Sequence, residues 1–149
     1  MKNYINLINS KSMSTTPVNH TITLHVTCSS VTNQTKDSCC NFGQSSGSNE
    51  SFNINVNVND TVTWVGQYDG PATTTPTVVN ITKIQKERDS EIFGKSNGVI
   101  QGSGSPETVE GTVQNDTAGL DEVYYLFFNL NGGQQIRIDP RITVNTGTS

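Results

Sequence analysis

The stretch Phe52-Asn53-Ile54-Asn55-Val56-Asn57-Val58-Asn59 decides the fold class of this protein. Apolar residues and Asn alternate in it without a break, and a period of two places every apolar side chain on one face of a β-strand. We therefore expect the apolar face to fill a core and the Asn face to point outward. The residues of this outer face are Asn53, Asn55, Asn57 and Asn59.

Seven further segments on either side have strand patterns. They are Thr21–Cys28, Thr61–Val65, Thr77–Ile84, Thr108–Gln114, Val123–Leu130, Gln134–Ile138 and Ile142–Val144. Segment 123–130 is apolar on both faces, which predicts a central strand. The residues Asn131-Gly132-Gly133 predict a hairpin turn, and the Gly- and Ser-rich residues 29–51 and 94–106 predict long loops.

The composition agrees with an all-β protein. Among 149 residues there are 14 Val and 11 Ile but only 5 Leu and 2 Ala, and branching at Cβ favours the pleated sheet over the helix. The length suits one domain. We predict a two-sheet Greek-key sandwich of seven or eight strands, cupredoxin-like or immunoglobulin-like, over residues 18–149, preceded by a loosely ordered segment 1–17. The expected core anchors are Phe52, Trp64, Tyr125, Phe127 and Phe128.

Charge and hydropathy exclude several classes of partner. The net charge is −4 and no basic cluster occurs, which argues against binding of nucleic acid through its phosphates. No apolar run approaches the length of a membrane span. Asn residues interrupt the apolar residues of segment 1–9, so we expect no cleavable secretory signal. These features predict a cytoplasmic protein, with an extracellular location as the alternative.

The three cysteines, Cys28, Cys39 and Cys40, leave three interpretations open. Reduced thiols in a cytosolic protein are the favoured one. A disulfide from Cys28 to either Cys39 or Cys40 is the second, and it would leave one thiol over. Metal binding is the least favoured, because a lone Cys-Cys pair lacks the second pair of ligands that a structural zinc site needs.

The sequence contains few residues that could support catalytic or redox chemistry. A blue-copper site needs two His, a Cys and usually a Met, with most of them in the last hairpin, but residues 130–135 hold none of these types. The only histidines are His20 and His25, and we expect His25 to be exposed on its strand. A hydrolytic triad would have to use one of these two. We therefore predict a protein without enzyme activity, metal or cofactor.

A carbohydrate- or calcium-binding, lectin-like module is the alternative function. Such modules place acidic and amide oxygens and an aromatic ring on loops, and Ca²⁺ prefers oxygen ligands. The candidate groups lie in Tyr68-Asp69-Gly70 and in the loop containing Asn115-Asp116 and Asp121-Glu122. Asp and Asn are also common in turns for the sake of their own backbone hydrogen bonds, which is the simpler interpretation.

Two segments resemble the AidA/PixA inclusion-body protein family. Asn59-Asp60-Thr61-Val62-Thr63-Trp64 is similar to a turn and strand found in that family and in cupredoxin-like sandwiches. Tyr125-Leu126-Phe127-Phe128, followed by Asp139-Pro140-Arg141-Ile142-Thr143-Val144, is similar to the family's ending. The chain departs from the family at Val26-Thr27-Cys28 and in its cysteine-containing loop. The resemblance implies a compact β-sandwich that accumulates inside bacterial cells and packs into ordered inclusions, and it implies no enzyme activity.

The Asn face of residues 53–59 also suggests self-association. Strands that lie at a sheet edge usually carry Lys or Pro, which prevent pairing with another chain, and this strand has neither. Charged residues make up only 15% of the chain, below the roughly 25% of ordinary domains. A solvated outer face is the simpler interpretation of the Asn residues. We predict a structural or self-assembling protein whose main partner is a further copy of itself.

Overall fold

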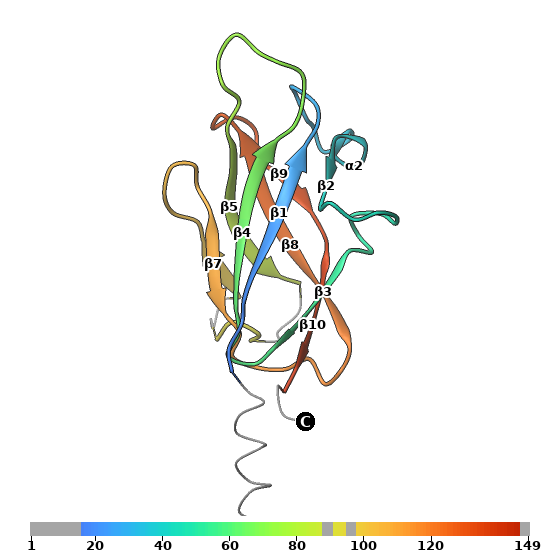
Figure 1. Ribbon diagram of the computed structural model, residues 1–149, viewed down its shortest axis with the longest axis vertical. Helices are drawn as coiled ribbons and strands as arrows, with labels where there is room; N and C mark the ends of the chain where they lie inside the picture. Colours follow the sequence, from blue (N-terminus) through green and yellow to red (C-terminus); the bar gives the residue numbers. More distant parts are fainter. Residues whose placement is uncertain (1–15, 88–90, 95–97, 147–149) are drawn as a thin grey trace, which may run out of the picture.

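Two β-sheets pack face to face in the computed structural model, which describes residues 16–87, 91–94 and 98–146 (Figure 1). The four-stranded sheet has the order β2 (Cys40–Asn41), β1 (Asn19–Val26), β4 (Thr61–Tyr68) and β7 (Val109–Thr112). The six-stranded sheet has the order β3 (Asn53–Asn57), β10 (Arg141–Asn145), β8 (Asp121–Leu130), β5 (Val79–Lys86) and β6 (Val99–Gln101), with β9 (Ile136–Ile138) also paired to β8. The predicted two-sheet sandwich is confirmed.

Both sheets are mixed. Strand β1 runs parallel to β4, and β3 runs parallel to β10, whereas the other pairs are antiparallel. Strand β8 lies in the middle of the six-stranded sheet, as its apolar pattern predicted. The turn from β8 to β9 has positive φ angles at Asn131 and Gly132, which a tight hairpin requires.

The core between the sheets is centred on Trp64 and Tyr124. The Trp64 indole nitrogen donates a 3.0 Å hydrogen bond to the Tyr124 hydroxyl, so two large buried rings leave no polar atom unsatisfied. Phe128 is also fully buried, as predicted. Phe52 is half-buried and packs against the edge of the core, so the prediction was only partly right for it, and it was wrong for Tyr125 and Phe127, which are half-buried outside the core.

The two misplaced aromatic residues lie on the outer surface of the six-stranded sheet, because β8 turns alternate residues to opposite faces. Cations shield them from water there. The Lys83 ammonium lies 4.5 Å from the centre of the Phe127 ring, and the Arg137 guanidinium carbon lies 4.2 Å from that of Tyr125. An apolar pattern on both faces of a strand therefore does not by itself mean burial on both faces.

Several predicted boundaries were also wrong. Strand β1 ends at Val26, not at Cys28, because the chain then turns into a disulfide-closed loop. The segment predicted as a loop over 29–51 contains a short helix, α2 (Lys36–Cys39), and strand β2. The segment predicted as a loop over 94–106 contains β6. Both missed strands are too short, at two and three residues, to show a period of two.

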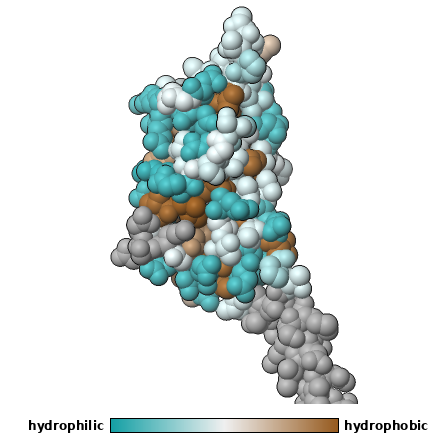
Figure 2. All heavy atoms as spheres, turned by 90° about the vertical axis from the view of Figure 1, so that its left-hand side faces the viewer, coloured by the Kyte–Doolittle hydropathy of each residue, from teal (hydrophilic) through white to brown (hydrophobic). Residues whose placement is uncertain are grey.

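The two long sides of the sandwich differ. On one side β7 approaches β6 closely, since a β-carbon at Gly111 would lie 2.6 Å from the Ile100 side chain. Figure 2 shows this side as largely hydrophilic, with apolar residues gathered near its middle. On the other side the Phe42 and Phe52 rings stack with centres 4.6 Å apart and join the ends of β2 and β3. The free lengths of β1 and β3 flank this second side (Figure 1).

Within the described residues, no helix is long and apolar enough to cross a membrane. The predictions for the amino-terminal segment, both its loose order and the lack of a secretory signal, fall mainly on residues 1–15, which lie outside the described residues.

Candidate functional site

The candidate site is the outer edge of β3. Its neighbour β10 pairs with the even-numbered residues of this stretch, because the Arg141 amide donates to the Phe52 carbonyl and the Val58 amide donates to the Asn145 carbonyl. In such a parallel ladder the odd-numbered residues turn their backbone groups the other way. Among the described residues, none bonds to the backbone amide or carbonyl of Asn53 or Asn55 on that side. We call these four groups the open edge of β3.

The structure separates the four predicted Asn residues into three kinds. Asn55 and Asn57 are exposed on the outer surface of the six-stranded sheet, as predicted. Asn53 is half-buried, and its side chain hydrogen-bonds the Thr143 hydroxyl at 3.0 Å. Asn59 does not belong to the strand at all. It has φ 82° in the turn that follows β3, a conformation that Asn tolerates better than most residues.

The buried carboxylate of Asp60 fixes the lower end of β3. One of its oxygens accepts a hydrogen bond from the Val18 amide at 2.9 Å, and the other is bonded to the Asn57 amide at 2.9 Å and to His20 Nε2 at 2.8 Å. Burial alone raises the pKa of Asp60, but these hydrogen bonds outweigh it and the pKa lies below its usual value. The sequence suggested only a turn at Asn59-Asp60.

The edge of β9, in contrast, is capped. The three-residue strand β9 has one residue, Arg137, whose backbone groups face away from β8. Its amide donates to the Asn33 side chain at 3.2 Å, and its carbonyl accepts from the Lys36 ammonium at 2.5 Å. Two loop side chains thus take the place of a neighbouring strand. No sequence signal links Asn33 and Lys36 to a strand about one hundred residues later.

The loop that supplies these caps is closed by a disulfide between Cys28 and Cys39. This pairing is one of the two disulfides that the sequence left open, and it corrects the favoured prediction of reduced thiols. Cys40 remains a buried thiol. Its burial, with a contribution from Asp37, raises its pKa to about 12, so it stays protonated and unreactive at neutral pH.

A second polar cluster lies on the outer surface of the four-stranded sheet. Asp69 accepts hydrogen bonds from Gln67 and His25, each at 2.7 Å, and both lower the pKa of its carboxyl group. The His25 side chain is 25% exposed, so the expectation of an exposed residue was only partly right. The nearby Tyr68 hydroxyl donates to the Pro71 carbonyl at 2.6 Å. All these groups serve the local structure of β1 and β4.

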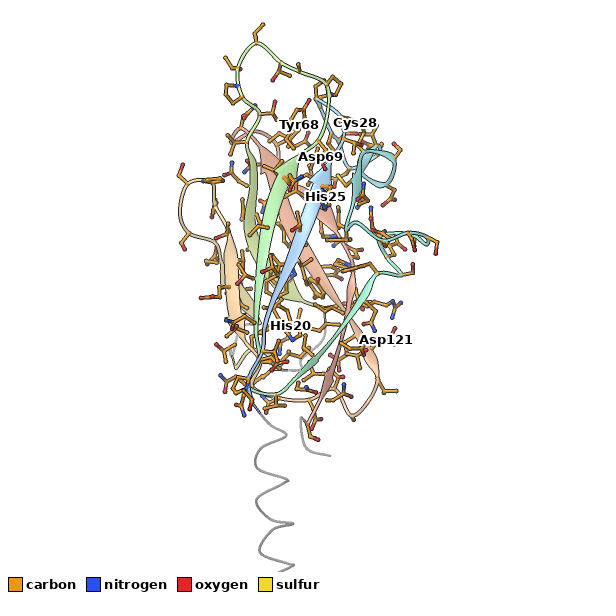
Figure 3. All side chains as sticks on the ribbon, in the orientation of Figure 1. His20, His25, Cys28, Tyr68, Asp69 and Asp121 are labelled. Atoms are coloured by element: carbon orange, nitrogen blue, oxygen red, sulfur yellow. A yellow bond between two sulfur atoms is a disulfide. The ribbon has the colours of Figure 1, made fainter. Side chains whose placement is uncertain are left out.

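The residues predicted for a lectin-like site do not converge. Asp69 and Tyr68 lie at one end of the sandwich and Asp121 lies at the other (Figure 3). Asp116 accepts a hydrogen bond from the Ala118 amide in its own turn, and Asp121 pairs with Arg141 at 3.2 Å. Within residues 16–87, 91–94 and 98–146, no three His, Cys, Asp or Glu side chains form a group that could hold a metal ion.

Three shallow pockets of about 230 to 290 Å³ lie elsewhere on the surface. One lies between residues 29–31 and the β8–β9 hairpin, a second in the loop around Ser45, and a third beside Phe93 and Ile100. None of them includes His20, His25 or Asp69. The pockets therefore bring none of the candidate acid–base groups together.

No protein-family model matches this sequence, and no curated protein matches it.

Proposed function

We propose that this chain is a non-enzymatic structural protein that assembles with copies of itself, and that the open edge of β3 forms part of the contact. The observation that supports the proposal is the state of this edge. Strand β3 carries no charge and no proline, and none of the described residues caps its edge, whereas the edge of β9 is capped by Asn33 and Lys36. Exposed strand edges of this kind pair readily with other strands.

The surface chemistry around the edge supports the same function. The exposed Asn55 and Asn57 side chains offer amide donors and acceptors beside the backbone groups of the edge. Neutral amides lose less on desolvation than charged groups do, so a contact through this surface is not opposed by buried charge. Ordered inclusions, as the AidA/PixA-like segments suggest, are one form that such an assembly would take.

The cellular compartment is a separate part of the proposal. The Cys28–Cys39 disulfide supports an oxidising compartment, because such bonds rarely persist in a reducing cytosol. Alkylation of thiols in intact cells, followed by mass spectrometry of the peptide containing Cys28, tests this point. Alkylation of Cys28 would show that this residue is a free thiol in the cell, and it would favour the cytoplasmic location that the sequence predicted.

The self-assembly proposal is tested by placing charge on the surface of β3. Because Asn55 and Asn57 are exposed, changing both to Lys costs the folded monomer little, about 0.5 kcal/mol each at most. Lys side chains on an edge strand oppose its pairing with a further strand, and natural sheet edges carry them for this reason. We expect wild-type protein to form higher-order species in size-exclusion chromatography with light scattering, and N55K/N57K to lose them.

The matched control adds the same charge elsewhere. Ala72 and Thr74 are exposed in the loop between β4 and β5, and we expect A72K/T74K to assemble as wild type does. A wild-type chain that stays monomeric at high concentration across pH and salt would refute the proposal. So would an N55K/N57K variant that assembles as well as wild type.

A further inference from the structure

Strand β1 has an open edge of its own. Its even-numbered residues pair with β4, because the Val18 carbonyl accepts from the Thr61 amide and the Val26 carbonyl accepts from the Asp69 amide. On its other side β2 pairs only with His25 and Val26. The backbone groups of Thr21 and Thr23 therefore face outward, and no backbone group of the described residues bonds to them there.

The open edges of β1 and β3 flank the same side of the sandwich. Strands β6 and β7 close the opposite side, where Gly111 meets Ile100. On the open side the stacked rings of Phe42 and Phe52 join the end of β2 to the start of β3, and these two strands belong to different sheets. Neither β1 nor β3 contains Lys, Arg, Asp or Glu. One side of the molecule therefore presents two uncharged strand edges, one from each sheet.

The two edges also lie at the same height along the sandwich. The Asp60 carboxylate binds the amides of both Val18 and Asn57, at 2.9 Å each, so these two residues are level. Going up the sandwich from this point, residue numbers increase along β1 and decrease along β3. Each strand advances about 3.3 Å per residue. By this count Asn55 is level with His20 and Asn53 with Ile22, so the outward-facing residue of β1 nearest to Asn55 is Thr21 or Asn19. We take Thr21, which places Asn53 opposite Thr23 and uses the open groups of both threonines.

We propose that two copies of this chain pair reciprocally across this side, with β3 of each copy adding to β1 of the other about a two-fold axis parallel to the strands. This inference rests on the proposed self-assembly and specifies its contact. Rotation about such an axis leaves every residue at its own height, so Asn55 meets Thr21 of the second copy and Asn53 meets Thr23. Strands β1 and β3 run in opposite directions, so the new ladder is antiparallel and joins the open groups of both edges.

Sheet size favours this arrangement over the alternative two-fold. An axis perpendicular to the sheets would pair β3 with β3 and β1 with β1. Because β9 and β10 lie along the same side of β8, each six-stranded sheet is five strands wide, and joining two of them gives a sheet ten strands wide beside one of eight. Twisted open sheets rarely exceed about ten strands without curling or splitting. The reciprocal arrangement joins each six-stranded sheet to a four-stranded one and gives two sheets of equal size.

Disulfide trapping distinguishes the two arrangements. Hydrogen-bonded antiparallel pairs have Cα atoms about 5.5 Å apart, within the range that a disulfide bridges. We expect a mixture of the N55C and T21C variants to give a covalent dimer on mild oxidation, with the linked peptides identified by mass spectrometry. We expect N53C alone, N55C alone and a mixture of N53C with N55C to give none, because only the perpendicular axis brings β3 of one copy beside β3 of the other.

The exposed loop residue Thr74 provides the control, and N55C mixed with T74C should stay uncrosslinked. Circular dichroism of each variant confirms that it is folded before oxidation. A covalent dimer from N53C and N55C, alone or together, or none from either mixture while wild-type protein is oligomeric, would overturn the reciprocal pairing and leave self-assembly standing. Wild-type protein that is monomeric in light scattering would overturn both.

Discussion

At the scale of single residues, Asp60 contributes most to the geometry of the candidate site. Its side chain is 3% exposed and accepts hydrogen bonds from Val18, from Asn57 and from His20. These bonds hold the start of β1 and the end of β3 together and set the height of the two open edges. Hydrogen bonds to a charged group contribute about 1.5–3 kcal/mol each, more than bonds between neutral groups.

The lowered pKa of Asp60 predicts a loss of stability in acid. A carboxyl group whose pKa is lower in the folded chain contributes stability above its unfolded value of 3.8 and loses it as the pH falls through the folded value. We expect the unfolding free energy of wild type, measured by urea titration, to fall from pH 5 toward pH 2. The D60N variant should be less stable at pH 7 and show a smaller fall. Parallel curves for the two proteins would contradict the assignment.

At the scale of elements, the disulfide loop works as an edge cap. The bond from Cys28 to Cys39 closes the segment that carries Asn33 and Lys36, and those two side chains occupy the backbone groups of Arg137. Because a single residue of β9 carries both groups, two side chains are enough to cap the strand. The cap keeps the edge of β9 from pairing with another strand, and none of the described residues caps the edge of β3 in this way.

Opening the loop should therefore affect a strand far away in the sequence. Replacing both bonded cysteines, C28S/C39S, should cost about 2–4 kcal/mol in unfolding free energy, because the loop regains freedom in the unfolded chain. Hydrogen exchange of the Arg137 amide should become faster than in wild type by more than the global loss of stability explains. If only global stability changes, the loop does not cap β9. The C40S variant is the control, since this thiol is unpaired.

The same elements show where sequence patterns stop being informative. A period of two located most of the longer strands, because core burial on one face leaves a local signature in Val, Ile and Asn. It did not reveal β2 or β6, which are too short, nor the cations that shield Tyr125 and Phe127. These cations come from β5 and β9, and only the pairing of those strands with β8 places them over the rings.

At the scale of the whole molecule, the proposed self-assembly would couple stability to concentration. An assembly that the folded chain enters and the unfolded chain does not shifts the unfolding equilibrium by mass action. The proposed reciprocal pairing would cover the open backbone groups of β1 and β3 at the same time, while the Asn and Thr side chains stay on the faces of the enlarged sheets.

The melting temperature of wild-type protein should consequently rise with concentration. Raising the concentration to a hundred times the dissociation constant adds about 2.7 kcal/mol, which corresponds to roughly 5–10 °C for a chain of this size. Scanning fluorimetry over that range measures the shift. We expect N55K/N57K to melt at a constant temperature and A72K/T74K to follow wild type. A shift of the same size in all three proteins would place the contact outside β3.

The sequence by itself determined that the chain is all-β, which segments form its longer strands, and that Asn55 and Asn57 face outward. It determined these features because residue type and alternation act within a strand. Only the tertiary structure decided that β3 is an edge strand, that Cys39 and not Cys40 bonds Cys28, and that Asp60 ties β1 to β3. All three features depend on which distant segments become neighbours in the fold. The alternating sequence of β3, for example, would be the same if the strand lay in the centre of a sheet.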